Sequence, residues 1–133
     1  MPIELSWYIE NRVIHAHVYG EAGLEQLRQM IVDVQPYLEE GIEPIHIILD
    51  DATANPPPVS IKQLKAVLDI GKQEVSKLGW VVGVGDVNVI AKVVIPMLAK
   101  IVKIKHVRVD TMEDALAILK RQDLSLTIEA ENQ

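Results

Sequence analysis

The run IHIILD, residues 45–50, constrains the fold more than any other part of the sequence. Apart from His46, its side chains are apolar on both faces until the carboxylate at its end. This composition is typical of a central strand in a parallel sheet, which is buried on both sides. Parallel neighbours need long crossover connections, and these are usually helices. The run therefore predicts an α/β fold.

Two strand-like runs precede it, LSWYIE at residues 5–10 and RVIHAHVYG at residues 12–20. They meet at Glu10 and Asn11, and Asn tolerates the positive φ that a tight turn demands. We expect an antiparallel hairpin here.

Apolar residues at helical spacing predict four helices. The first covers residues 21–40, where we expect Pro36 to kink or shorten the last turn. The second begins at Ser60 as its N-cap. The third covers residues 89–103, and the fourth begins at Asp110, with Asp110 and Glu113 spaced as a capping box.

Two further strands are expected, at residues 80–85 and 106–109. The second alternates polar and apolar side chains, which favours an edge strand. The predicted order is β-β-α-β-α-β-α-β-α, a mixed five-stranded sheet with four helices. We assign residues 1–127 to one domain and residues 128–133 to a polar tail.

Composition excludes several functions. The 133 residues contain no Cys, which excludes a disulfide framework, a thiolate metal site and a Cys nucleophile. The net charge of −6 has the wrong sign for a general nucleic-acid binder. No apolar stretch reaches the roughly 20 residues of a membrane span, and no signal peptide is visible. We expect a cytoplasmic protein, and the sequence indicates no cofactor.

The element order and two stretches, residues 45–64 and 106–120, resemble the STAS domain, the fold of bacterial anti-sigma-factor antagonists and of sulfate-transporter tails. In the first stretch a buried strand ends at Asp50 and Asp51, and a loop leads to a Ser at the next helix. The second, HVRVDTMEDALAILK, is similar to the family's last strand and closing helix. The resemblance covers roughly residues 4–122. It implies a non-enzymatic regulatory module that binds a protein partner.

The chain departs from the family at the loop that precedes the second helix. Antagonists carry an Asp-Ser-Ser-Gly-like motif there, and a kinase partner phosphorylates its Ser. Here the stretch reads NPPPVSIKQL, so Val59 and Ile61 flank Ser60 in place of the motif's Asp and Gly. A phosphate on Ser60 would suit a helix N-terminus, and a plain N-cap explains the residue equally well.

The resemblance places a docking surface around this loop, because STAS antagonists use this face. Three consecutive prolines would hold the loop in a polyproline-like form. The predicted partner-binding residues are Asp50, Asp51, Thr53, Pro56, Pro57, Pro58, Ser60 and Lys62.

Other side chains have a structural and a chemical interpretation. Asp50 and Asp51 resemble a Mg²⁺ pair, but turn-forming Asp residues at the end of a strand are commoner, and we predict no metal. His15 and His17 face the same way on a strand. Two ligands are too few for Zn²⁺, so we expect an incompletely buried sheet face that a homo-oligomer covers. We interpret His46 as a core histidine bonded to a neighbour.

The predicted helix at residues 89–103 is apolar around most of its circumference. It is therefore core, an interface, or the wall of a ligand pocket. The alternative function is a carrier or sensor of a small apolar or lipid-like anionic ligand, with Lys92 and Lys100 near the head group. An enzyme would need converging titratable groups, and the sequence assembles none.

Overall fold

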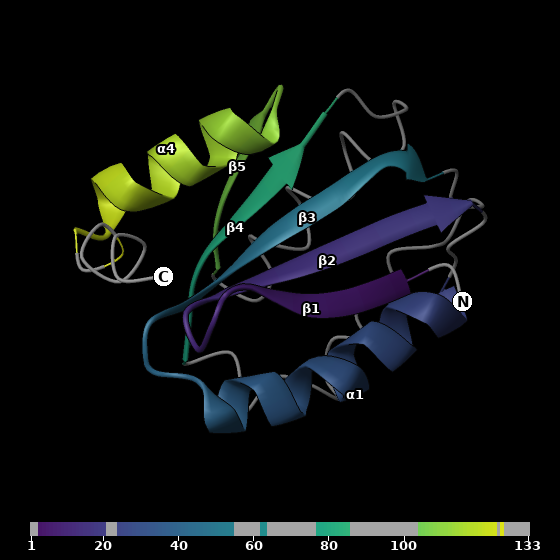
Figure 1. Cartoon of the computed structure of the whole chain (residues 1–133). Helices are drawn as coiled ribbons and strands as arrows, with labels where there is room; N and C mark the ends of the chain where they lie inside the picture. The colour runs from purple at the N-terminus through teal and green to yellow at the C-terminus, as the bar shows by residue number, and fades with distance from the viewer. Residues whose placement is uncertain are drawn as a thin grey trace.

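The computed structural model describes residues 3–20, 24–54, 62–63, 77–85, 104–124 and 126. Within them the chain forms one five-stranded sheet in the order β1-β2-β3-β4-β5 (Figure 1). β1 is antiparallel to β2, and the remaining neighbours are parallel. The predicted mixed sheet is confirmed. The strands are β1 Ile3–Ile9, β2 Val13–Gly20, β3 Ile45–Ala54, β4 Leu78–Val84 and β5 Lys105–Val109.

The first two strands form the predicted hairpin. Asn11 has a φ of 65°, and the backbone N–H of Arg12 donates to the carbonyl of Ile9 over 3.0 Å. The register shifts between Trp7 and Ile9. This bulge lets Trp7 and Ile9 pack in clusters on opposite sides of the sheet, although they are two residues apart.

Helix α1, Leu24–Glu40, packs on one face of the sheet. The Tyr37 ring meets Trp7 edge to face, and its hydroxyl donates to the Leu5 carbonyl of β1 over 3.1 Å. We expected Pro36 to kink or shorten the last turn; the helix continues four residues past Pro36 and is not shortened, and the kink stays a prediction. Val32, whose carbonyl lacks its usual donor at Pro36, is on the exposed side and can bond water.

Strand β3 lies at the centre of the sheet, as its composition predicts. It is longer than expected, because it continues through Asp50 to Ala54 instead of turning at the two carboxylates. The added residues pair with the end of β2, where Tyr19 lies opposite Thr53 and Gly20 opposite Ala54. Backbone pairing with β2 thus keeps the polar sequence extended.

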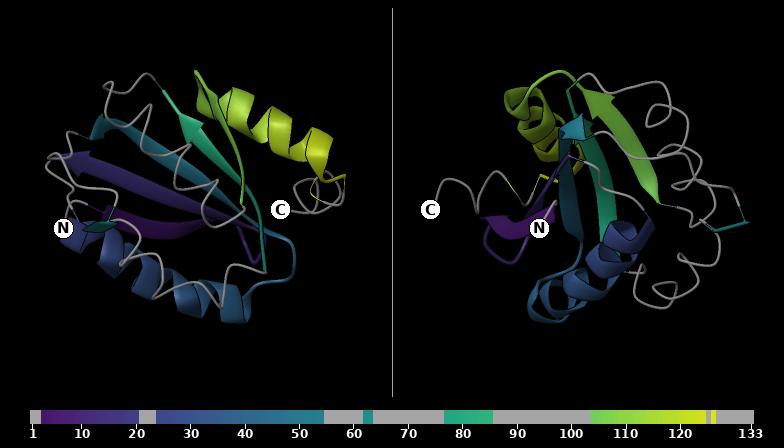
Figure 2. Two further views of the ribbon diagram at one scale, coloured as in Figure 1. Left: turned by 180° about the vertical axis from the view of Figure 1, so that it is seen from behind. Right: turned by 90° about the vertical axis from the view of Figure 1, so that its right-hand side faces the viewer.

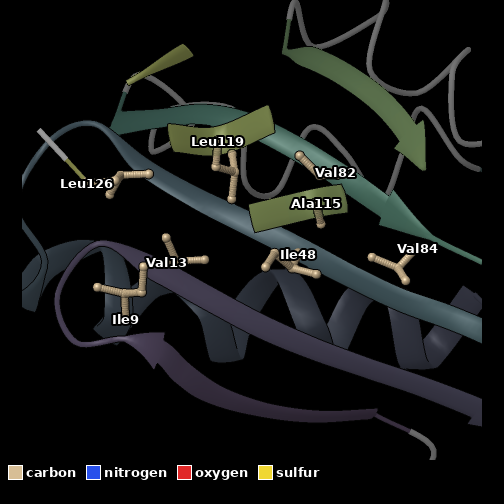
Figure 3. Close-up of a cluster of buried hydrophobic side chains, with 8 residues drawn as sticks. All are labelled: Ile9, Val13, Ile48, Val82, Val84, Ala115, Leu119 and Leu126. Carbon is tan, nitrogen blue, oxygen red and sulfur yellow. The ribbon is translucent and has the colours of Figure 1, made fainter. Parts of the chain in front are cut away.

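Helix α4, Met112–Gln122, covers the opposite face (Figure 2). Its inward residues Ala115 and Leu119 meet β2, β3 and β4 (Figure 3). Leu126, four residues past the helix, is fully buried in the same cluster. Each fully buried aliphatic side chain contributes roughly 1.5–3 kcal/mol, so this cluster fixes α4 on the sheet. Its buried members are Ile9, Val13, Ile48, Val82, Val84, Ala115, Leu119 and Leu126.

The N-cap of α4 is Thr111, not Asp110 as the capping-box spacing predicts. The Thr111 hydroxyl accepts a hydrogen bond from the backbone N–H of Asp114 over 3.1 Å. The capping residue is therefore one position later in the sequence than expected.

The structure describes two helices, α1 and α4, rather than the four that we predict. Residues 62–63 are helical, and the rest of the helix expected from Ser60 lies outside the described residues. The helix expected at residues 89–103 lies outside them entirely. The predicted edge strand is confirmed, since β5 is last in the sheet order.

Candidate functional site

The carboxyl end of β3 leads into the segment in which the sequence predicts a docking surface. β3 pairs with β4 only as far as Asp50, which lies opposite Val84. It pairs with β2 as far as Ala54. Among the described residues, Thr53 and Ala54 thus pair with β2 alone, Asp51 and Ala52 lie at a register shift in that pairing, and the end of β3 projects beyond the end of β4.

Asp50 is bonded across the sheet to a histidine. Its Oδ2 lies 3.1 Å from Nε2 of His15, and both side chains are about one third exposed, at 31% and 27%. Because His15 lies opposite Ile48 in the register, this bond runs diagonally between β2 and β3. Asp50 is two residues after Ile48, which packs against α4, so its carboxylate lies on the same face of the sheet as α4.

Four rings form a row on this face. Tyr8 lies 6.4 Å from His15, His15 lies 6.2 Å from His17, and His17 lies 5.1 Å from Tyr19, between ring centroids. Glu4 flanks the row, with its carboxylate 3.4 Å from the Tyr19 hydroxyl and 3.9 Å from Nδ1 of His17. We name this surface the histidine face; it consists of Glu4, Tyr8, His15, His17, Tyr19 and Asp50.

The histidine face confirms one prediction and leaves another untested. His15 and His17 share one side of the sheet and are incompletely buried, as expected. The homo-oligomer that would cover them stays a prediction, because the structure contains a single chain.

The predicted docking and ligand residues fall into three groups. Asp50 and Lys62 have described side chains, and Lys62 is exposed. Asp51 and Thr53 are placed only as backbone in β3. The others lie outside the described residues, so their roles stay predictions; they are Pro56, Pro57, Pro58, Ser60, Lys92 and Lys100.

Neither a metal-binding group nor a membrane-spanning helix is found in the described parts of the chain. No group of three or more His, Asp or Glu side chains in these parts is arranged to hold a metal ion. No helix in them is both long enough and apolar enough to cross a membrane.

A second polar group lies buried at the amino ends of the parallel strands. Arg12 and His46 are only 3% and 2% exposed. Both contact the same oxygen, Oδ2 of Asp123, at 2.6 Å from the guanidinium Nη2 and 2.9 Å from the imidazole Nε2. The guanidinium also donates to the carbonyl of Pro44, which follows a cis peptide bond. We name these three side chains the Arg12–His46–Asp123 cluster.

The hydrogen bonds of His46 define its protonation. The backbone N–H of Trp80 donates to Nδ1 over 2.9 Å, so Nδ1 carries no proton. Nε2 must then carry the proton that is donated to Asp123. Burial lowers the pKa of His46 below its ordinary value, against the opposing effect of Asp123. The imidazole is therefore neutral at neutral pH.

His46 is the bonded core histidine that the sequence predicts, but neither of its charged neighbours was predicted. Asp123 is 77 residues from His46 and 111 from Arg12 in the chain. The sequence gives little indication that Arg12 is buried. Arg12 is the first residue after a predicted turn, where a charged side chain is ordinarily exposed. No local pattern indicates its burial.

A mixed sheet that opens with a hairpin, continues in parallel strands and carries α1 and α4 on opposite faces defines a STAS-like α/β fold. A solved structure of the same class supports this assignment: an uncharacterised DUF3478-family protein from Shewanella loihica PV-4, described as having a SpoIIAA-like fold. The two chains superpose with a TM-score of 0.62 at 15% identity, over 88% of this chain and 91% of the other.

The STAS-like fold predicted from the sequence is thus confirmed. Comparison by sequence adds nothing to it, since no family model and no curated protein matches the chain.

Proposed function

We propose that the chain is a non-enzymatic, cytoplasmic regulatory module of STAS type, which docks a protein partner through the segment from the end of β3 to Lys62. The observation that carries this proposal is the half-paired end of β3, at which the segment begins. In open α/β sheets, ligands bind beyond the carboxyl ends of the parallel strands. The segment begins at this end of the sheet.

The docking segment combines strand backbone, for which the described residues supply a partner on the β2 side alone, with polar residues and prolines. Among the described residues no strand pairs with the β4 side of β3 beyond Asp50, and the proposed partner would bond the backbone donors and acceptors there. Three consecutive prolines follow, and a stiff loop loses less conformational entropy on binding than a flexible one. Ser60 belongs to the proposed segment either as the N-cap of the next helix or as a phosphorylated side chain.

The carrier hypothesis has no equivalent support. It depends on Lys92, Lys100 and the helix expected at residues 89–103, which lie outside the described residues. We therefore retain it only as the alternative.

Replacing the three prolines by glycine (P56G/P57G/P58G) tests the docking proposal. We expect the variant to keep its circular dichroism spectrum and to lose the proteins that the wild type enriches in quantitative affinity purification from its native cells. Loss is expected because a flexible loop must be ordered on binding. Arg121→Glu is the matched control, since Arg121 is exposed on the last turn of α4, which lies at the amino end of β3, and should leave enrichment unchanged. Equal enrichment by all three proteins would remove the docking assignment.

A further inference from the structure

The Arg12–His46–Asp123 cluster joins three distant parts of the chain. Arg12 follows the hairpin turn, His46 lies near the start of β3, and Asp123 ends α4 as its C-cap. The backbone N–H of Asp123 still donates to Leu119 within the helix, over 2.8 Å. The cluster therefore fastens the last turn of α4 to the amino ends of the strands.

His46 can make its two hydrogen bonds only as a neutral ring. It accepts at Nδ1 from Trp80 and donates at Nε2 to Asp123. A second proton would sit on Nδ1 and face the Trp80 N–H, so that two donors would meet at 2.9 Å. The charged imidazole must give up this contact with β4.

The ring has little room to turn away from this conflict. Gly79 of β4 packs directly against it: a Cβ built on Gly79 would lie 2.5 Å from both Nδ1 and Cε1 of His46. Only a residue without a side chain allows the ring to lie so close to the strand. A protonated ring can therefore lose the Trp80 bond only if β3 and β4 move apart locally or the ring leaves its site.

Charged groups face the ring from each element around it. Asp123, at the end of α4, favours the protonated ring. Arg12, from the hairpin, and Lys105, from β5, oppose it. The ammonium group of Lys105 lies 5.7 Å from the centre of the Trp80 ring, beside the strand to which His46 is bonded. Together with burial, these groups give the folded protein a lowered His46 pKa.

We propose that His46 makes the contact between β3 and β4 sensitive to pH, so that acidification loosens the amino end of β4, at Trp80, from β3. At neutral pH the ring is neutral and both bonds are made. In acid the ring takes up a second proton and the Trp80 bond is lost, whereas Asp123 keeps its contacts with Arg12 and with the charged ring. This proposal does not depend on the docking segment.

The direction of the effect follows from the two protonation states. In the unfolded chain the imidazole has an ordinary pKa of about 6.5 and binds a proton more readily than in the folded protein. The stabilisation is complete above pH 6.5 and falls as the pH drops through that value, because the unfolded state takes up the proton first.

Urea unfolding at pH 7.5 and pH 5.5, one unit on either side of this value, tests the proposal. We expect the urea concentration at the midpoint of wild-type unfolding to be lower at pH 5.5 than at pH 7.5. The midpoint of His46→Gln, which has no titrating ring, should change much less between the two pH values. His17→Gln is the control, since His17 is partly exposed on the histidine face, and it should behave as the wild type. Equal changes in wild type and His46→Gln would overturn the proposal.

A measurement on the wild type alone keeps the test decisive if His46→Gln does not fold. Nitrogen-15 spectra of the imidazole should show an unprotonated Nδ1 at neutral pH, and the site should titrate below the ordinary histidine value. Amide exchange, corrected for its intrinsic pH dependence, should accelerate at Trp80 in acid before it does in the β2–β3 ladder. A protonated Nδ1 at neutral pH, or uniform acceleration, would refute the proposed loosening of β4 from β3.

Discussion

The substitution Gly79→Ala tests how tightly β4 is packed against His46. Gly79 and Gly83 both lie in β4, and neither has the left-handed backbone that would strain another residue. Since the effect of a methyl group on the unfolded chain is the same at both positions, the difference between the two variants depends on what surrounds each glycine. At Gly79 the new Cβ would lie 2.5 Å from two atoms of the His46 ring and 3.3 Å from Cβ of Pro44.

Two contributions set the magnitude. Forcing a carbon into a filled site costs about 1–3 kcal/mol through displaced neighbours. His46 is 2% exposed and is held at both ring nitrogens, so moving it also deprives the buried N–H of Trp80 of its acceptor. A buried donor without a partner costs about 1–3 kcal/mol. We expect Gly79→Ala to lower the free energy of unfolding by about 3 kcal/mol.

Gly83→Ala is the matched control in the same strand. Its Cβ would lie 2.7 Å from the guanidinium of Arg108, which is the far end of a flexible side chain. Moving Arg108 loses its 3.2 Å bond to the carbonyl of Gly85, a cost of about 1 kcal/mol. Replacing Gly by Ala regains about 0.4–1 kcal/mol by restricting the unfolded chain. We expect the two effects to cancel.

Urea unfolding of the two variants and the wild type at pH 7.5 gives both free energies. Comparable slopes against urea would show that the same surface is exposed on unfolding. A difference between the variants of less than about 1 kcal/mol would refute the close packing of His46 on β4. Greater destabilisation by Gly83→Ala would place the rigid contact at Arg108 instead.

Two further substitutions test the ends of α4. Thr111→Ala removes the N-cap oxygen and should cost about 1 kcal/mol in thermal unfolding, whereas Thr111→Ser should cost little; equal losses would show that the hydroxyl is not the cap. Asp123→Asn removes the charge next to buried Arg12 and should cost about 3 kcal/mol in urea unfolding. The exposed control Asp110→Asn should change stability little, and an equal effect of both would contradict the assigned pairing.

The parts of the fold that depend on neighbouring residues were predictable from the sequence. The hairpin follows from two alternating runs around Asn11, whose positive φ the structure confirms. The central place of β3 follows from its uninterrupted apolar composition. The burial of His46 follows from its position as the only polar residue inside that run.

The errors occur where tertiary pairing overrides a local signal. Two adjacent carboxylates favour a turn, but pairing with the end of β2 keeps β3 extended past Asp50 to Ala54. Pro36 favours a shortened helix, but packing of Tyr37 and Leu38 holds the last turn of α1 on the sheet. The contact between Arg12 and Asp123 joins residues 111 apart, and no pattern within either segment encodes it.

The late position of Leu126 and Asp123 has a consequence for the order of folding. Synthesis from the amino end produces β1 and β2 first, yet Ile9 and Val13 lie in a core that Leu126 completes. Contacts of such high sequence separation form slowly, because a long loop must close before they contribute. Until residues 112–126 have been synthesised, Ile9 and Val13 stay uncovered by α4 and Leu126. In that interval a chaperone can bind these uncovered apolar side chains.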